Sequence, residues 1–174
     1  TPFALNRGDV VVFVDPGGWL SIQRGVSEED PISWVLNAAT IFIGLSSPDD
    51  NEHLVKRVIG LPGDTIECCD DQGRTSINGV ALEEPYVYLP EGVGKVSSDD
   101  FAVEVPDNSL WVMGDNRYNS ADSRRNRDKP GGGFVPVDNV VGRAIVISWP
   151  QDRWRWLDNF SDTFDGVESR DSSR

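Results

Sequence analysis

The sequence predicts a mainly β fold, a coiled β-sheet or barrel with one short helical insertion. Most apolar residues fall in short runs that are rich in β-branched side chains. The 17 glycines and 11 prolines are enough to interrupt the chain with many turns. Only one segment carries apolar residues at helical spacing. With 174 residues, the chain is expected to form one compact domain.

The predicted strands are short, and Gly, Pro, Asn or Asp residues separate them. The Asn78-Gly79 dipeptide predicts a tight hairpin turn after one of them. In chain order the strands are 9–14, 54–59, 65–68, 75–77, 101–105, 110–113 and 140–148.

The single predicted helix covers residues 31–45, within an insertion of about 14–53. Asp30 is suited to cap its start, Pro31 to its first turn, and Gly44 to its end. Its wide apolar face predicts packing against the sheet or, alternatively, contact with a membrane surface.

The chain changes character after residue 150, so we expect a core at 1–150 and an aromatic, acidic C-terminal tail at 151–174. The aromatic residues of this tail have three possible roles: packing on the barrel, lying at a lipid interface, or belonging to a partly disordered end. They are Trp154, Trp156, Phe160 and Phe164.

Charge and hydropathy exclude two classes of protein. The net charge of −13 argues against a nucleic-acid partner, because such binding needs a basic surface. No apolar run reaches the roughly 18 to 20 residues of a membrane span. The chain begins at Thr1 without a signal segment, which leads us to expect a piece trimmed from a longer protein.

The two cysteines, Cys68 and Cys69, are adjacent. Across a trans peptide their Cα atoms lie about 3.8 Å apart, below the roughly 4.4 Å of ordinary disulfides. We therefore expect one packed and one half-exposed thiol, with a redox pair as the alternative. A single histidine, His53, and no metal-ligand spacing predict no metal site and no cofactor.

Lys56 is the only one of three lysines that stands inside an apolar strand. By alternation it shares a face with Leu54 and Val58. If that face points inward, desolvation lowers the pKa of the amine and makes it a general base near neutral pH. From this strand alone, a solvated lysine is the more common arrangement.

A second candidate for chemistry is the polar segment 114–124. Its Asp, Asn, Arg and Ser residues suit a loop held by charge-assisted hydrogen bonds. It does not fit a calcium loop, because Arg117 and Ser120 stand where such a loop needs an acidic residue and a glycine. A solvated polar turn is the alternative.

Three motifs, given below in chain order, together closely resemble those of the bacterial type I signal peptidase family. The matching frame spans roughly 7–150. The motifs are Arg7-Gly8-Asp9-Val10-Val11-Val12-Phe13, Val55-Lys56-Arg57-Val58-Ile59-Gly60-Leu61-Pro62-Gly63-Asp64 and Gly114-Asp115-Asn116-Arg117-Tyr118-Asn119-Ser120-Ala121-Asp122-Ser123-Arg124.

The resemblance implies a membrane-anchored serine protease with a Ser–Lys dyad and no cofactor, which removes signal peptides from exported preproteins after an Ala-x-Ala-like motif. Lys56 matches the general base, and Ser120 matches the residue that orients its amine. Arg57 with Asp115 matches an ionic pair that fixes the loop. Asp122 with Arg124 matches a second such pair.

The resemblance also implies where the substrate binds. The strand residues His53, Leu54 and Val55 match the edge on which the signal peptide pairs as an added β-strand. Val12 and Val55 are expected to face the pockets for small residues.

The nucleophile of the family lies in a Ser-Met-x-Pro-Thr motif, and no serine here has those neighbours. We therefore expect the nucleophile upstream of this chain, which would be inactive alone. The full protein is expected at the extracytoplasmic face of the cell membrane, anchored by an upstream segment. The long insertion resembles the form found in high-GC Gram-positive bacteria.

Two other functions compete with this interpretation. A non-catalytic β-barrel peptide-binding module would keep the substrate groove and perform no chemistry. A self-cleaving repressor-type protein also uses Ser and Lys, but proteins of that type lack the segment that follows Gly114 here.

Overall fold

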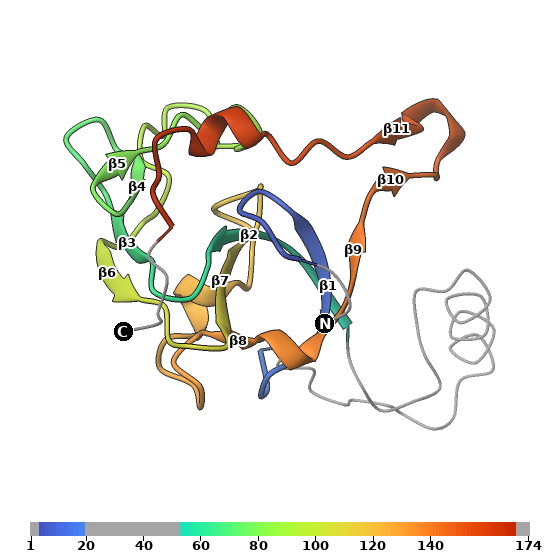
Figure 1. Ribbon diagram of the computed structural model, residues 1–174. Coiled ribbons are helices and arrows are strands. Elements are labelled where there is room, and N and C mark those ends of the chain that lie inside the picture. The colour runs from blue at the N-terminus through green and yellow to red at the C-terminus, as the bar shows by residue number, and fades with distance from the viewer. Residues whose placement is uncertain (1–3, 20–52, 170–174) are drawn as a thin grey trace, which may run out of the picture.

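The fold is mainly β, as expected, in a computed structural model that describes residues 4–19 and 53–169 (Figure 1). The predicted helix at 31–45 lies outside these residues, with nearly all of the insertion. No helix within the described ranges is long and apolar enough to cross a bilayer. The strands are β1 (Val10–Val14), β2 (His53–Gly60), β3 (Thr65–Cys68), β4 (Thr75–Ile77), β5 (Val80–Ala81), β6 (Phe101–Glu104), β7 (Ser109–Met113), β8 (Val135–Pro136), β9 (Val140–Ala144), β10 (Val146–Ile147) and β11 (Arg155–Trp156).

The larger sheet has the strand order β8-β7-β2-β1-β9, with antiparallel neighbours throughout. In the β1–β2 pair, Val12 faces Val55 and Val11 faces Lys56. Four short 3₁₀ helices complete the described elements. They are η1 (Ser123–Asn126), η2 (Val137–Asn139), η3 (Gln151–Arg153) and η4 (Ser161–Phe164).

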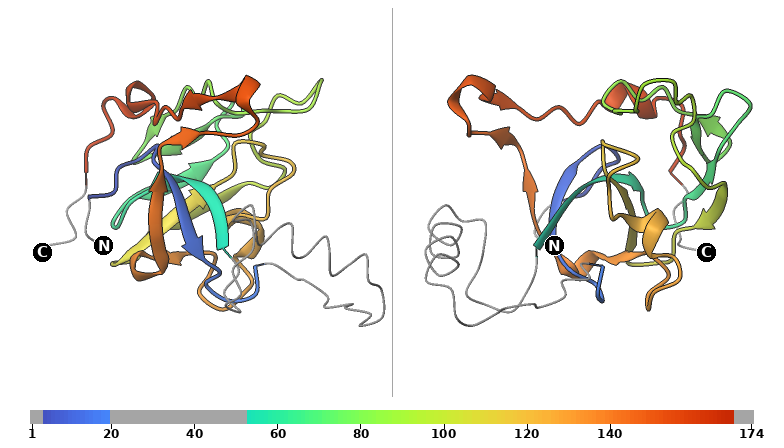
Figure 2. Two further views of the ribbon diagram at one scale, coloured as in Figure 1. Left: turned by 90° about the vertical axis from the view of Figure 1, so that its right-hand side faces the viewer. Right: turned by 180° about the vertical axis from the view of Figure 1, so that it is seen from behind.

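The second sheet has the order β5-β4-β3-β6 and lies beside the first (Figures 1 and 2). Asn78 and Gly79 form the turn between β4 and β5 with φ angles of 53° and 84°. Two positive φ values in succession match the two-residue hairpin turn that the sequence predicts. The strands form no closed barrel within the described ranges.

Two apolar cores lie on opposite faces of the central strands. On β7, Leu110 and Val112 belong to one core, while Trp111 and Met113 belong to the other. All four side chains are fully buried. Because both faces of β7 are covered, its sequence is apolar without alternation. This packing fixes the middle of the sheet, where β2 carries Lys56.

The predicted strand at 140–148 is divided in the structure. Ala144 is the last residue of β9 that pairs with β1, opposite Val10. The chain then leaves the sheet, and β10 pairs with β11 in a separate hairpin. This hairpin extends away from the two sheets (Figure 2). The prediction of a single strand was wrong here. Because β1 begins at Val10, the residues after Ala144 have no partner in β1 to pair with.

The aromatic residues of the tail do not share one environment. Phe164 is buried, and Phe160 packs on Tyr86 with ring centroids 5.1 Å apart. Trp154 and Trp156 are 60% and 67% exposed. Packing, the first of the predicted alternatives, therefore applies to the two phenylalanines, whereas the two tryptophans lie exposed on the surface.

The cysteine prediction was wrong, because Cys68 and Cys69 are joined by a disulfide. The prediction assumed a trans peptide, which separates the two Cα atoms by about 3.8 Å and points the side chains to opposite faces. In the structure the peptide bond is cis and the Cα atoms are 3.0 Å apart.

Candidate active site

Lys56 lies in β2 with its side chain half-buried. Its neighbours on the same face, Leu54 and Val58, are buried in one of the two cores. Burial lowers the pKa of the Lys56 amine below its ordinary value, and the negative charge of Asp122 partly opposes this shift. Of the two predicted arrangements, Lys56 therefore adopts the one in which its face of the strand points inward and its amine is partly desolvated.

Gly114 brings Ser120 close to the Lys56 side chain. A methyl group placed on Gly114 would lie 2.2 Å from Ser120 Oγ and 3.7 Å from Lys56 Cδ. Only a residue without a side chain leaves room for both groups at this point. Ser120 Oγ is buried and has no hydrogen-bond partner among the described residues. The hydrogen bond to the Lys56 amine that the resemblance implies is therefore not formed in this structure.

Asp122 and Arg124 fix the end of the polar loop, which is the segment 114–124. Asp122 is fully buried, and its carboxylate accepts hydrogen bonds from Arg124 Nε at 3.0 Å and Nη2 at 2.6 Å. The same carboxylate accepts from the backbone N–H of Gly114 at 3.0 Å and caps helix η1. One carboxylate thus joins the two ends of the loop that contains Ser120.

Arg57 and Asp115 fix the start of the same loop. The Arg57 guanidinium donates to both carboxylate oxygens of Asp115, at 2.9 and 2.8 Å. Arg57 is 3% exposed, and such a two-point contact has a fixed orientation. Because Arg57 follows Lys56 directly, the ion pair ties the lysine strand to the residue after Gly114.

A buried ion pair between Glu84 and Arg117 was not predicted. Arg117 donates to Glu84 from Nη1 at 2.9 Å and from Nη2 at 2.5 Å, and Tyr86 Oη donates to the same carboxylate at 2.8 Å. Burial of Tyr86 itself, together with the negative charge of Glu84, raises the pKa of the Tyr86 hydroxyl well above its usual value. Arg117 stood in the third motif, but Glu84 lies 33 residues away in a segment that carries no motif.

The first motif joins the second through Arg7 and Asp64. Arg7 donates to both oxygens of Asp64, at 2.8 and 2.6 Å, and Asp64 is fully buried. Together with the Arg57–Asp115 contact, this pair links all three motifs. The polar residues of the motifs thus form one connected framework around Lys56.

The first half of β2 has one open edge within the described ranges. Residues 53–57 pair with β1 on one side, whereas β7 ends at Met113, opposite Arg57. Val55 is 53% exposed beside half-buried Val12, and His53 is exposed. Leu54 points into the core, so only its backbone is available to a ligand.

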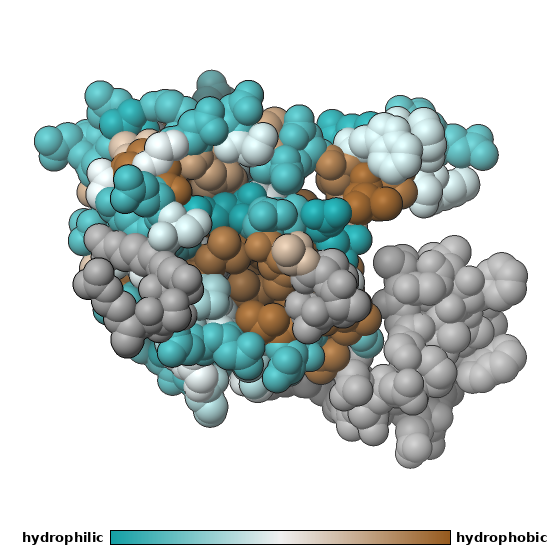
Figure 3. Space-filling view, viewed as in Figure 1, coloured by the Kyte–Doolittle hydropathy of each residue, from teal (hydrophilic) through white to brown (hydrophobic). Residues whose placement is uncertain are grey.

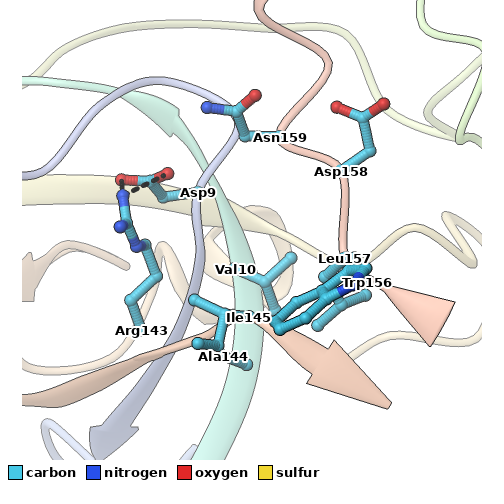
Figure 4. A pocket seen from close by; sticks show the side chains of 9 residues that line it. All are labelled: Asp9, Val10, Arg143, Ala144, Ile145, Trp156, Leu157, Asp158 and Asn159. Atoms are coloured by element: carbon cyan, nitrogen blue, oxygen red, sulfur yellow. Dashed lines mark hydrogen bonds and ion pairs between the residues drawn. The ribbon is translucent and has the colours of Figure 1, made fainter. Parts of the chain in front are cut away.

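A separate pocket of about 440 Å³ lies on the far side of β1 (Figure 4). The Asp9–Arg143 ion pair forms one wall, with 3.3 Å between Arg143 Nη1 and Asp9 Oδ1. Trp156 and Leu157 form the opposite wall. None of the predicted site residues lines this pocket.

Comparisons with known proteins agree with the motifs. The family model for signal peptidase, peptidase S26, matches residues 2–149. "Signal peptidase I" of Mycobacterium tuberculosis (strain ATCC 25618 / H37Rv) is 43% identical over 159 residues, covering 84% of this chain and 53% of that protein. "Probable signal peptidase I" of Mycobacterium leprae (strain TN) is 38% identical over 165 residues, covering 84% and 56%. The chain thus spans about half the length of these curated relatives.

Relatives outside the mycobacteria match a smaller part of the chain. "Signal peptidase I S" of Bacillus subtilis (strain 168) is 41% identical over 112 residues, or 61% of this chain and 57% of that protein. The crystal structure of a signal peptidase I from Enterococcus faecalis V583 matches with a TM-score of 0.50 and 25% identity, covering 82% of this chain and 98% of that one.

Proposed function

This chain belongs to the signal peptidase family, peptidase S26, and we propose that its full-length protein is a signal peptidase I, a serine endopeptidase. In this proposal it removes the signal peptides of exported preproteins after an Ala-x-Ala-like motif. Lys56 acts as the general base, and Ser120 is its orienting partner.

The observation that carries the proposal is the environment of Lys56. Its side chain is half-buried beside Ser120, and burial lowers the pKa of its amine. A larger fraction of the amine is therefore neutral near pH 7 than for a solvated lysine, and a neutral amine accepts a proton from a serine hydroxyl. The unpartnered Ser120 hydroxyl is available to hydrogen-bond that amine.

The open edge of β2 supports a peptide substrate. An extended signal peptide that pairs with residues 53–56 would form backbone hydrogen bonds there and pass beside Lys56. Its alternate side chains would then lie near Val12 and Val55. In this proposal the two valines line the pockets for the small residues of the motif.

In this proposal the nucleophilic serine comes from sequence outside these 174 residues. The only methionine here is Met113, so the Ser-Met-x-Pro-Thr motif of the family does not occur. The matched relatives are about twice as long as the aligned region, which leaves room for that motif elsewhere. This chain alone is then inactive.

We also place the full protein at the extracytoplasmic face of the cell membrane, in contact with the membrane surface. The β10–β11 hairpin supports this contact, because Trp149, Trp154 and Trp156 are 76%, 60% and 67% exposed. Tryptophan favours the interface between lipid and water. The space-filling view shows apolar surface at this end of the molecule (Figure 3).

The proposal is tested by cleavage of a preprotein with an Ala-x-Ala signal peptide. Three proteins are compared: this chain, the chain extended N-terminally as its gene encodes, and the extended Lys56→Ala variant. We expect cleavage only by the extended protein with Lys56 intact. Equal cleavage by the short chain would place the nucleophile within these 174 residues. Binding without cleavage by all three would favour the peptide-binding module.

A further inference from the structure

The C-terminal strap, residues 157–168, crosses from the hairpin end of the molecule to the second sheet (Figures 1 and 2). It lies beyond the part that matches the family model, which ends at residue 149. At its start, the Leu157 N–H donates to Ile145 O at 2.9 Å. At its end, Phe164 and Val167 are buried in a core, and Asn78 Nδ2 donates to Glu168 O at 3.0 Å.

The middle of the strap contacts Arg57, the residue after Lys56. Arg57 Nη1 donates to Asp158 O at 3.0 Å. The Arg57 Cζ atom lies 5.3 Å from the centroid of the Phe160 ring and 4.2 Å from that of Tyr86. A guanidinium at these distances from aromatic rings gains cation–π attraction. The strap thus supplies both a hydrogen-bond acceptor and an aromatic ring to this side chain.

Gly8 of the first motif lets the strap approach so closely. A methyl group on Gly8 would fall 1.8 Å from Asn159 O, and the residue has φ +89°. The carbonyl of the same Gly8 accepts from Arg57 Nη1 at 2.7 Å. Gly8, Arg57 and the strap therefore form a single contact region.

The remaining donors of Arg57 hold the polar loop. The Nε and Nη2 atoms bind the Asp115 carboxylate. The residue before Asp115 is Gly114, where an added methyl group would lie 2.2 Å from Ser120 Oγ and 3.7 Å from Lys56 Cδ. A rotation of the guanidinium would move Asp115 and change the spacing between Ser120 and Lys56. Contacts with the strap restrain that rotation.

We infer that the C-terminal strap is a positioning element for the Lys56 site, acting through Phe160, the Asp158 carbonyl and Arg57. The inference rests on the proposed function for its catalytic meaning, since Lys56 is the base of that proposal. Phe160 and Arg57 touch no reacting atom and are positioning residues.

The experiment uses the three lysines of the chain, whose amines report separately. The rate at which each amine reacts with acetic anhydride is followed by mass spectrometry across a pH series. The pH at which a lysine reaches half its maximal rate is called its midpoint. In the unaltered chain, we expect the Lys56 midpoint to lie below the ordinary value for a lysine amine. Phe160→Leu should raise the Lys56 midpoint by at least about half a pH unit, which is a threefold change in the neutral fraction. Arg57→Lys should do the same, because an ammonium cannot replace the planar fork.

Phe164→Leu is the matched control, because it makes the same chemical change at a buried ring of the strap that lies beside Gly8 but, unlike Phe160, makes no cation–π contact with Arg57 among the described residues. It should lower Tm and leave the Lys56 midpoint in place, whereas Phe160→Tyr should restore the ring and the midpoint. An unchanged midpoint in both Phe160→Leu and Arg57→Lys would overturn the inference. An equal shift in Phe164→Leu would also overturn it, by showing general loosening.

A second readout is kinetic. In the N-terminally extended protein, Phe160→Leu should lower kcat several-fold with little change in KM, and move the acid limb of the pH profile to higher pH. If the unaltered extended protein cleaves no signal peptide, the proposed function fails. The labelling result still decides whether the strap positions Lys56, because that measurement needs no activity.

Discussion

Single atoms decide the geometry around Lys56, and Gly114 shows this most directly. Its α-hydrogen lies where any side chain would meet Ser120 at 2.2 Å from Oγ and 2.6 Å from Cβ. The same position lies 3.7 Å from Lys56 Cδ. The small size of this one residue therefore sets how closely the loop approaches the lysine.

Gly114→Ala should displace Ser120 and lower kcat of the N-terminally extended protein on the order of 100-fold, as expected for a shift of about 1 Å near a reacting group. The steady-state cleavage of an Ala-x-Ala substrate measures this loss. Gly94→Ala is the control, because nothing lies within 4 Å of its added methyl group. Equal activity of the Gly114 variant and the control would contradict the role of this contact.

Lys56 also affects stability in a pH-dependent way. Its pKa in the folded state lies below the ordinary 10.5, so the unfolded chain binds the proton more tightly. The resulting loss of stability is complete below the folded-state pKa and disappears above about pH 10.5. Because the side chain is only half-buried, solvent screening keeps this cost small.

Lys56→Met should therefore raise Tm modestly at pH 7, and the gain should shrink as the pH approaches 10.5. Thermal unfolding of this chain at several pH values provides the measurement. Lys95→Met, which removes a lysine whose side chain is 56% exposed, is the control variant. A gain in Tm that stays constant from pH 7 to 10.5 would show that packing, and not desolvation, is responsible.

At the scale of elements, the polar loop is held from outside by the segment between β5 and β6. The backbone N–H of Tyr88 donates to Asp115 O at 2.8 Å, and Arg117 binds Glu84 with side chains 1% and 3% exposed. A buried ion pair of this kind adds little net stability, but losing one partner leaves a buried charge without compensation.

Glu84→Gln should destabilise the chain by about 3–5 kcal/mol, because it leaves the Arg117 guanidinium buried beside a neutral amide. The double variant Glu84→Met with Arg117→Met should lose much less. Urea unfolding of Glu84→Met, Arg117→Met and the double variant yields the coupling energy. Additive losses would contradict a direct pair.

The sequence predicts elements better than the contacts between them. The positions of β3, β4 and β7 follow from their β-branched and aromatic residues, and Asn78-Gly79 predicts its turn because only certain residues tolerate positive φ. The inward face of Lys56 needed the structure, since one strand cannot reveal which side is covered. Glu84 had no signal, because it belongs to no motif and pairs with a residue distant in the chain. Phe160 was identified only as one of the tail aromatics, and its contact with Arg57 needed the structure.

For the whole molecule, two features oppose each other at a membrane. The net charge of −13 repels an anionic lipid surface, whereas the exposed tryptophans of the β10–β11 hairpin favour the lipid–water interface. The hairpin projects away from the two sheets (Figure 2). It can therefore enter an interface while most of the acidic surface stays in water.

This balance predicts the lipid preference of the chain. We expect it to bind phosphatidylcholine vesicles, measured by co-sedimentation, and to bind phosphatidylglycerol vesicles less at low salt. Binding to phosphatidylglycerol should increase with added salt, because the Debye length falls from about 30 Å at 0.01 M to about 10 Å at 0.1 M. Replacing Trp149, Trp154 and Trp156 by Ser should abolish binding to both, whereas Tyr88→Ser should not, although Tyr88 is 63% exposed. Binding that falls as salt is added would instead indicate attraction to basic side chains, and would exclude the hairpin as the membrane contact.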